Sequence, residues 1–423
     1  MKNDNLNWKG LRRTDPNRPR PLADAVLRLI WEEKRISRAD IARMANLSRS
    51  TVSEIIKEIL PFGVVAEVGE GPSRGGRRPI VLEFQDNACV ILGVEMSGSH
   101  VVVALTDLRG KALTWESREH PVRTDPAGTR KLIRELCQVC LGDPAAVGRP
   151  LVGIGVAVPC PVDPSRPGRL SNVVLPAWEE KLGLEDLAAK YNVPLMVDND
   201  ANLGALAEHW WGAGKGADDI AYIKVATGIG SGHIIGGEIY RGATGVAGEI
   251  GHISIDSAGK PCICGLRGCL VTLIGGPALV ARAVELSSEF PDSVLAGKLN
   301  SVNEIEDAAL AGDPLALTVA QEAASHLGRA VAGLMNLMNP SLVIVGGDLA
   351  RLGDLLLTPL RETVESRTLV SSVAAAKIQT SELGPLSVAI GASTLILKAA
   401  LSDSRLFPVL REPVEVSTGK SAS

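Results

Sequence analysis

The sequence predicts a two-part α/β protein, with a winged helix-turn-helix head followed by a larger two-lobed α/β body. The chain has 423 residues, of which 45% are hydrophobic, so it is too long for one ordinary domain and can fill several cores. Helical periodicity dominates residues 22–60, and a hairpin rich in glycine and arginine follows. From about residue 89, short β-rich runs alternate with helix-like runs in two sets that open in the same order.

Charge divides the chain at the same place. Residues 1–84 hold 16 Lys and Arg against 11 Asp and Glu, whereas the remainder holds 28 against 37. A basic head on an acidic body indicates that the head contacts a polyanion. We find no uninterrupted apolar run of about 18 residues and no secretory signal in the polar N-terminus. We therefore expect a cytoplasmic protein with no membrane span, whose seven cysteines serve as thiols or metal ligands rather than disulfides.

The head is expected at residues 21–86. Ser37 and Ser48 stand where two helices would need N-caps, and the segment between them turns the chain in the manner of a helix-turn-helix. Two strand-like runs then flank the basic loop, which is typical of a wing. Short hydroxyls and arginines suit phosphate and base-edge contacts. The predicted DNA contacts are Ser48, Arg49, Ser50, Thr51, Ser53 and Lys57 on the second helix, and Arg74, Arg77 and Arg78 on the wing. The alternative is a helical module that contacts only proteins.

The body begins with three strand-like runs separated by short turns, which predict an antiparallel meander. A second meander is expected from residue 220, and the last helix-like run, 389–401, is expected to fold back on the first lobe. The predicted limits are a flexible lead-in at 1–20, a first lobe at 87–198 completed by 388–410, a second lobe at 199–387 and a flexible tail at 411–423.

A cluster of metal-ligand residues is the strongest chemical signal. His252, Cys262, Cys264 and Cys269 fall within 18 residues in the loop 251–270. Three thiolates and one imidazole so close together fit a tetrahedral, structural Zn²⁺ site. The alternative is a loop of free thiols. Cys137 and Cys140 share a helical pattern with no nearby partners, so we interpret them as core or surface thiols.

Two further segments carry polar residues between apolar runs. Asn199 and Asp200 follow a strand-like run and precede a helix-like one, where an α/β protein places a carboxylate that must reach a ligand. The turn at 227–232 is rich in glycine and can present backbone N–H groups to phosphate oxygens.

These segments together resemble a known family. NDAN (199–202), ATGIGSG (226–232), GEIGH (248–252) with CICGLRGC (262–269), and PSLVIVGG (340–347) occur in the order and spacing of the ROK family of repressors, open reading frames and kinases. The resemblance covers essentially the whole chain, and the head is similar to that of the family's xylose-repressor-type and N-acetylglucosamine-repressor-type regulators. It implies an actin-like, ribonuclease H-like sugar-kinase fold and a zinc ion that shapes a sugar pocket. It also implies sugar contacts from Asn199, Asp200, Glu249 and His252, with Asp200 as general base in the kinases.

The sequence departs from the kinase pattern where phosphate would bind. Family kinases open with an Asp-x-Gly-Gly-Thr-like loop, and side chains here stand where backbone must approach phosphate. Val271, Val174 and Ala177 replace polar or small residues of the sugar pocket. The remnants of the phosphate loops are Glu95, Ser97, Gly98, Ser99, Thr227, Gly228, Gly230 and Gly232. We therefore do not expect the protein to use ATP and Mg²⁺.

These observations favour a DNA-binding transcriptional regulator, expected to be a repressor of carbohydrate uptake or catabolism genes. Its expected partners are a palindromic double-stranded operator, a sugar or sugar-phosphate effector in the interlobe cleft, and further copies of itself in a homodimer or homotetramer. The alternative is an ATP-dependent sugar kinase that also binds DNA, with Asp200 as catalytic base. A third reading makes the body a docking surface for another protein, such as a sugar-transport component.

Overall fold

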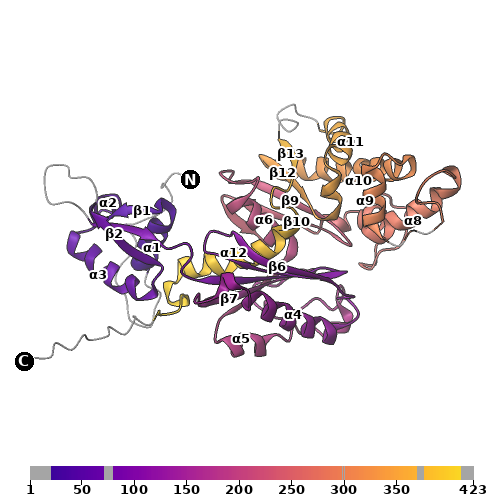
Figure 1. Cartoon of the computed structure of the whole chain (residues 1–423). Helices are drawn as coiled ribbons and strands as arrows, with labels where there is room; N and C mark the ends of the chain where they lie inside the picture. Colours follow the sequence, from indigo (N-terminus) through magenta and orange to yellow (C-terminus); the bar gives the residue numbers. More distant parts are fainter. Residues whose placement is uncertain (1–20, 71–79, 298, 300, 369–375, 411–423) are drawn as a thin grey trace, which may run out of the picture.

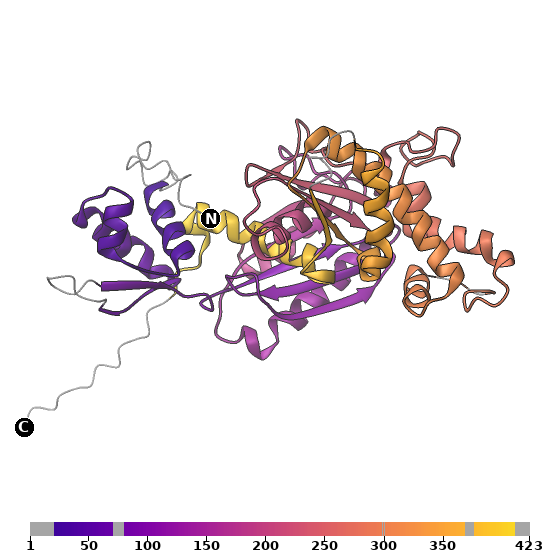
Figure 2. The same cartoon turned by 90° about the horizontal axis from the view of Figure 1, so that it is seen from above.

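The head and the body form one elongated molecule, with the head at one end (Figure 1). The computed structural model describes residues 21–70, 80–297, 299, 301–368 and 376–410. The predicted lead-in, the predicted tail and the three wing arginines, Arg74, Arg77 and Arg78, lie outside these ranges. Seen from above, the helices of residues 276–310 in the second lobe lie at the end of the molecule opposite the head (Figure 2).

The head is a winged helix-turn-helix. Its elements are α1 (Pro21–Glu33), β1 (Arg35–Ser37), α2 (Arg38–Met44), α3 (Arg49–Ile59), η2 (Leu60–Phe62), β2 (Val65–Glu70) and β3 (Ile80–Phe84). Both predicted caps are correct, because the Ser37 hydroxyl accepts a hydrogen bond from the Asp40 N–H and the Ser48 hydroxyl from the Thr51 N–H, each at 3.1 Å. The sequence analysis missed β1, which is three residues long and joins the sheet as β1-β3-β2. Such a short strand carries no periodic signal of its own.

The first lobe is a five-stranded sheet with helices on one side. Its elements are β4 (Val90–Met96), β5 (His100–Thr106), β6 (Ala112–Glu119), α4 (Pro126–Leu141), η3 (Pro144–Ala146), β7 (Leu151–Val158), η4 (Pro176–Trp178), α5 (Glu185–Tyr191) and β8 (Leu195–Asn199). The strand order is β6-β5-β4-β7-β8, in which the first three strands form the predicted antiparallel meander and the last two pair in parallel.

The second lobe repeats this topology. Its elements are α6 (Asp200–Trp211), β9 (Ile220–Val225), β10 (Ile229–Ile235), β11 (Glu238–Tyr240), η5 (Ile250–His252), α7 (Val271–Ile274), α8 (Gly276–Leu286), η6 (Ser287–Glu289), α9 (Val302–Leu310), α10 (Pro314–Met338), β12 (Leu342–Gly346), η7 (Asp348–Leu352), α11 (Asp354–Glu365) and β13 (Lys377–Thr380). The order β11-β10-β9-β12-β13 again places a meander beside two parallel strands. The shared order supports the duplication inferred from the sequence.

Two helices pack between the sheets: α6 and α12 (Ser387–Ser402), which follows η8 (Gly384–Leu386) and precedes η9 (Ser404–Leu406). Helix α12 approaches its neighbours closely: a Cβ on Gly155 of strand β7 would lie 1.8 Å from the Ala392 carbonyl oxygen of α12. A Cβ on Gly391 would lie equally close to the Leu203 carbonyl oxygen of α6. Among the described residues, one helical stretch, 384–402, is long and apolar enough to cross a membrane, but 67% of it is buried inside the protein, as in a core helix.

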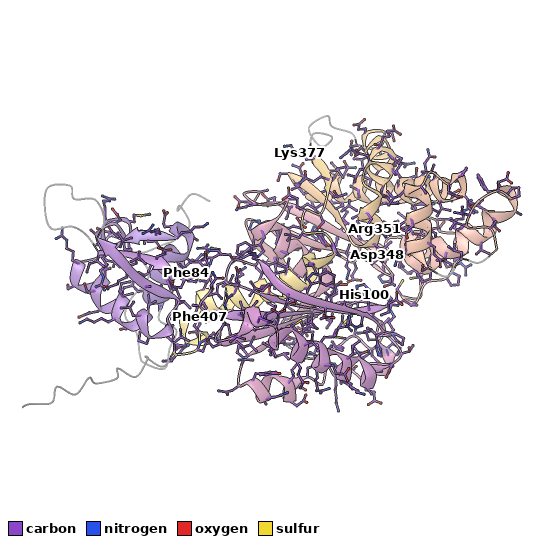
Figure 3. All side chains as sticks on the ribbon, in the orientation of Figure 1. Phe84, His100, Asp348, Arg351, Lys377 and Phe407 are labelled. Carbon is purple, nitrogen blue, oxygen red and sulfur yellow. The ribbon has the colours of Figure 1, made fainter. Side chains whose placement is uncertain are left out.

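The head shares a hydrophobic core with the body. Helix α12 lies on β4 and β7 of the first lobe, and its C-terminal half also packs against α1. Leu27 and Ile30 of α1 join Ile396 and Ala400 of α12 and Phe407 in one cluster, and Figure 3 labels Phe407 at this junction. The buried Asp24 carboxylate accepts a hydrogen bond from the Ser404 N–H at 2.9 Å. The head is therefore anchored to the body by packing, so a movement of α12 can shift the position of α1 in the head.

Candidate functional site

The recognition helix α3 presents a polar face to solvent. Arg49 and Ser50 at its start are exposed, as is Lys57 in its last turn. Thr51 and Ser53 are half-buried, and Val52 on the opposite face is fully buried. The Ser48 hydroxyl is occupied by the cap and by the hydroxyls of Ser50 and Thr51 at 2.8 Å each. The helix N-terminus and its exposed arginine match the arrangement with which such helices enter a major groove.

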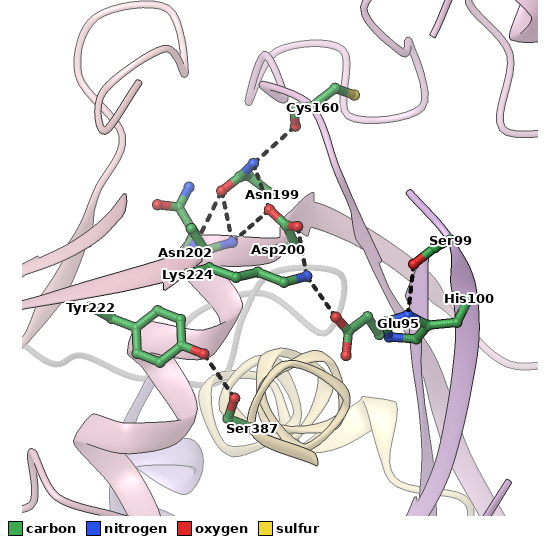
Figure 4. Close-up of polar contacts among 11 residues, drawn as sticks. Glu95, Ser99, His100, Cys160, Asn199, Asp200, Asn202, Tyr222, Lys224 and Ser387 are labelled. Atoms are coloured by element: carbon green, nitrogen blue, oxygen red, sulfur yellow. Dashed lines mark hydrogen bonds and ion pairs between the residues drawn. The ribbon is translucent and has the colours of Figure 1, made fainter. Parts of the chain in front are cut away.

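A buried lysine sits in the cleft between the lobes and binds two carboxylates. The Nζ atom of Lys224 donates to Oε1 of Glu95 at 2.6 Å and to Oδ2 of Asp200 at 2.9 Å (Figure 4). These three residues come from β4, α6 and β9, so the cluster joins both lobes. The exposed fraction of each side chain is small, at 8% for Lys224, 4% for Glu95 and 13% for Asp200. We call these three residues the ion triad.

The triad holds Lys224 in its charged form. Burial alone would lower the pKa of Lys224, but the negative charges of Asp200 and Glu95 and the hydrogen bonds to both outweigh burial and raise this pKa. Asp200 is therefore already engaged, since its Oδ1 atom also accepts from the Ala201 N–H at 2.8 Å. The sequence analysis missed Lys224. The sequence did carry one sign of it, because Lys224 lies within the apolar strand run IAYIKV. A lysine buried in such a strand needs a partner of opposite charge.

Asn199 is the N-cap of α6. Its Oδ1 atom accepts from the N–H groups of Ala201 and Asn202, and its Nδ2 group donates to the carbonyl oxygen of Cys160 and to Oδ1 of Asp200. This predicted sugar contact lines the cavity, yet its amide already holds the helix start and orients Asp200. The strand–cap–helix order of β8 and α6 thus places the carboxylate at the cleft, as the sequence implied.

The cleft contains a cavity of about 300 Å³ beside the ion triad, which is the lower end of the range for small-molecule pockets. It brings together all four predicted sugar contacts, Asn199, Asp200, Glu249 and His252. Burial, and then the charge of Asp200, raises the pKa of Glu249 to about 7. Val174 and Val271 line the same cavity, so the predicted apolar replacements do face it, whereas Ala177 is exposed to solvent.

The predicted phosphate-loop residues divide into two groups. Ser97, Gly98, Thr227, Gly228 and Gly230 line the cavity, with the turns at 97–99 and 227–228 facing each other. A Cβ on Gly98 would lie 2.5 Å from the Thr227 hydroxyl oxygen.

The remaining loop residues do not line this cavity. Glu95 belongs to the ion triad, and the Ser99 hydroxyl lies 3.3 Å from Nδ1 of His100. Gly232 instead allows β10 to approach α6, because a Cβ there would lie 2.1 Å from the Ala201 carbonyl oxygen.

The metal-ligand cluster predicted from the sequence is assembled at one wall of the cavity. The ligand atoms of His252, Cys262, Cys264 and Cys269 all lie within 4.8 Å of one another. Nδ1 of His252 is 3.4 Å from the sulfur of Cys262, and the sulfurs of Cys264 and Cys269 are 3.6 Å apart. Burial lowers the pKa of His252, which favours the neutral imidazole that binds metals. Four nitrogen and sulfur donors in this arrangement can hold one metal ion.

The two remaining predicted thiols are core residues. Cys137 and Cys140 are buried on α4, and burial raises the pKa of Cys140 to about 11. Neither belongs to the metal-ligand cluster.

Comparison with known proteins agrees with both parts of this description. A ROK family model matches residues 91–399, and a winged helix-turn-helix DNA-binding model matches residues 25–58. The xylose repressor of Caldicellulosiruptor bescii is 30% identical over 385 residues, which are 89% of this chain and 95% of that protein. The DNA-binding transcriptional dual regulator NagC of Escherichia coli is 31% identical over 378 residues, covering 89% and 92%.

Solved structures show the same division. A ROK family transcriptional regulator, described as a homologue of the Escherichia coli MLC protein, superimposes with a TM-score of 0.75 at 27% identity and covers 91% of this chain and 97% of its own. A ROK family glucokinase from Streptomyces griseus, in complex with glucose and AMPPNP, has a TM-score of 0.63 at 29% identity and covers 72% and 98%. The kinase thus matches a smaller share of the chain than the regulator does. The chain belongs to the ROK family, and it combines the family's domain with a DNA-binding winged helix-turn-helix.

Proposed function

We propose that this protein is a transcriptional repressor that binds operator DNA through its head and senses a sugar or sugar derivative in the interlobe cleft. The ion triad is the observation that carries this proposal. It places a buried ammonium group against Asp200, the carboxylate that would be the general base of a ROK kinase. The relatives named xylose repressor and N-acetylglucosamine repressor support a carbohydrate effector.

The triad argues against the kinase alternative on chemical grounds. A general base must be free to accept the proton of the attacking hydroxyl. Asp200 instead holds Lys224 with Oδ2 and the Ala201 N–H with Oδ1. Glu95, at the position of the kinase loop's aspartate, is turned to the same lysine. The carboxylates that would act on ATP, metal and sugar hydroxyl are thus committed to an internal cation, while hydrogen-bond recognition of a polyol remains possible.

We propose Zn²⁺ as the ion of the metal-ligand cluster and a structural role for it. Three cysteines and one histidine complete a tetrahedral set and leave no position for a reacting water. His252 and Cys262 also line the cavity, so a bound ion would hold that wall of the effector site in shape.

Helix α6 connects the cleft to the head. It begins at Asp200 and ends at Trp211, and the rings of Trp210 and Trp211 contact the ring of Trp31 on α1 at centroid distances of 5.3 and 6.1 Å. Arg109 stacks over Trp31 at 4.7 Å and donates to its carbonyl oxygen. Because α1 packs on α3, an effector that shifts the start of α6 can bias the orientation of the recognition helix.

The operator is expected to be palindromic and read by a homodimer or homotetramer, because two-fold protein symmetry pairs with two half-sites. We propose a cytoplasmic location, because a regulator of this kind must reach the DNA. A sugar-transport protein as a further partner is the alternative way for the body to receive its signal.

The test is sequencing of genomic fragments retained by the purified full-length protein at moderate salt, where non-specific phosphate binding is suppressed. We expect enrichment of a few palindromic sites near carbohydrate genes. Arg49→Ala should abolish that enrichment, and Arg118→Ala, on the exposed edge strand β6 of the body, should leave it intact. If no site is enriched, the head is an interaction module. ATP-dependent phosphorylation of a sugar, lost in Asp200→Asn, would restore the kinase alternative.

A further inference from the structure

A second cavity lies within the second lobe, outside the cleft between the lobes. It has a volume of about 850 Å³ and is bounded by α8, α10 and the loop 251–270 that carries the metal-ligand cluster. Helices α8 and α10 lie on the side of the body away from the head (Figure 1). Pro261, Thr272 and Ala278 line both this cavity and the interlobe cavity beside the ion triad, so the two cavities share a wall. We call the second one the lobe cavity.

Part of the charge in the lobe cavity is neutralised internally. The guanidinium group of Arg282 donates to both carboxylate oxygens of Glu322, at 2.8 and 2.9 Å. The Nζ atom of Lys260 donates to Oε1 of Glu285 at 2.9 Å. These pairs match two cations with two carboxylates, and they fasten α8 to α10 and to the loop. The four side chains are therefore engaged in holding the walls of the cavity together.

Two arginines of the same cavity have no counter-charge. Within the part of the chain that the structure describes, no hydrogen bond or ion pair joins the side chain of Arg267 or Arg329 to another group. The third carboxylate of the lining, Asp256, accepts a hydrogen bond from the Ala258 N–H at 3.0 Å and so stabilises a turn of its own loop. The lining thus holds four cations against three carboxylates, whereas residues 85–423 hold 28 cations against 37 carboxylates. A cavity with surplus positive charge in an acidic body attracts anions.

His326 adds a third hydrogen-bond donor. It stands three residues before Arg329 on α10 and lines the lobe cavity. Its Nδ1 atom is buried and has no hydrogen-bond partner among the described residues. Burial, and then the charge of Arg329, lowers the pKa of His326, so the imidazole is neutral near pH 7. A neutral imidazole carries one N–H group, and burying that group without an acceptor is costly, so the hydrogen belongs on Nε2. The Nε2–H group is then available to a ligand.

We propose that the lobe cavity is a binding site for a small organic dianion, held by the guanidinium groups of Arg267 and Arg329 and by the Nε2–H group of His326. Each guanidinium fork can pair with a carboxylate or a phosphate through two parallel hydrogen bonds. The volume of the cavity admits an organic molecule and not only a bare ion. The ligand class is therefore a dicarboxylate or a phosphate ester, and the experiment distinguishes the two. This inference does not depend on the proposed sugar sensing, which concerns the interlobe cavity.

The experiment is calorimetric titration of the full-length protein at an ionic strength of about 0.15 M, which screens non-specific attraction. The probes are succinate, malate, glycerol 3-phosphate and inorganic phosphate, with acetate as the monoanion control. We expect at least one organic dianion to bind tenfold or more tightly than acetate, and more tightly than inorganic phosphate. Tightest binding of succinate or malate would assign a dicarboxylate, and tightest binding of glycerol 3-phosphate would assign a phosphate ester.

Three variants locate the binding. Arg267→Gln and Arg329→Gln should each weaken the binding of that dianion by roughly 10- to 100-fold, since each removes a charge-assisted hydrogen-bonding group. Arg118→Gln, on β6 outside both cavities, should retain it. All three residues are exposed, so the melting temperatures of the variants without ligand should stay within about 2 °C of the wild type. A loss of binding is then not a loss of folding.

Three results would overturn the inference: no organic dianion that binds more tightly than acetate, binding that is unchanged in both Arg267→Gln and Arg329→Gln, or an equal loss of binding in Arg118→Gln. A probe that binds both arginine variants as tightly as the wild type occupies another site. If a second copy of the chain covers the lobe cavity, no probe binds there and the inference falls. Operator enrichment tests the proposed function separately, so each of the two can fail while the other stands.

Discussion

Replacing Lys224 by methionine tests whether the ion triad exists in solution. Methionine keeps most of the length of the side chain but removes the charge, and it leaves Glu95 and Asp200 buried with exposed fractions of 4% and 13%. Removing one partner of a buried ion pair costs about 3–5 kcal/mol of unfolding free energy, because an uncompensated charge stays in the interior. At about 2–4 °C per kcal/mol, the melting temperature of the body should fall by roughly 6–20 °C.

The assay is thermal unfolding monitored by circular dichroism or calorimetry at pH 8 and again at pH 5.5. In the Lys224→Met variant, protonation of Glu95 and Asp200 removes an uncompensated buried charge. It therefore stabilises the folded state more than the unfolded state. The folded state then binds more protons, so the loss of stability should shrink as pH falls. A second variant that adds Glu95→Gln and Asp200→Asn should recover much of the loss at pH 8, since no buried charge is left.

The matched control is Lys215→Met, because Lys215 is exposed and has no ion pair among the described residues. Its melting temperature should change by no more than about 2 °C, as for most surface substitutions. A loss in Lys224→Met no larger than in this control, or a loss that the added Gln and Asn do not relieve, would refute the triad and with it the argument against phosphoryl transfer.

The remaining predictions concern the metal, the head–body contact and one buried acid. The double variant Cys262→Ser and Cys264→Ser should contain no zinc by elemental analysis and should unfold at a lower temperature. The control Cys137→Ser, which changes a buried thiol of α4, should keep its zinc. A zinc-free wild-type protein would contradict the assignment. Trp31→Ala should leave effector affinity unchanged but remove most of the effect of the effector on operator affinity. Fluorescence anisotropy of labelled operator measures this effect. An intact response would show that the contact of Trp31 with α6 does not couple the cleft to the head. Glu306 is fully buried, and burial, followed by the charge of Asp348, raises its pKa from 4.5 to about 7, although Arg351 lies 2.9 Å from its Oε2 atom and opposes the shift. The folded state therefore keeps a proton that the unfolded state has lost, and up to about 3 kcal/mol of stability is lost as pH rises from 4.5 to 7. Glu306→Gln should flatten that pH dependence of unfolding, and an unchanged slope would refute the assignment.

The sequence alone predicted features whose signals are local. The caps at Ser37 and Ser48 were found because a hydroxyl residue directly precedes each helical pattern. The meanders were found because strand runs and glycine turns alternate over a few residues. The metal-ligand cluster was found because its four residues lie within one loop. In each case the residues that interact with one another lie close together in the sequence.

The residues that the sequence analysis missed depend on partners far along the chain. Lys224 meets Glu95 across 129 positions, and the strand pattern around it gives no sign of that partner. Trp31 meets Trp210 only because α1 and α6 come together in the folded protein. Arg123 stands in the polar segment between β6 and α4, and it lines the interlobe cavity only because the turns at 97–99 and 227–228 lie beside it in the folded protein. Their roles follow from tertiary packing, which local periodicity does not report.

The ion triad also explains why a regulator would keep a kinase-like aspartate. Asp200 stands at the first turn of α6, where a negative charge stabilises the helix N-terminus. Through Lys224 it is tied to Glu95 of the other lobe. Loss of Asp200 would leave the lysine with one partner and remove the link between the first turn of α6 and Glu95, although Asn199 would still cap the helix. A hydroxyl-bearing ligand that hydrogen-bonds Asp200 must share this carboxylate with Lys224, so binding acts on the contact that joins the lobes. The residue that a kinase uses to take a proton can therefore serve here to make the helix leading to Trp31 sensitive to the ligand.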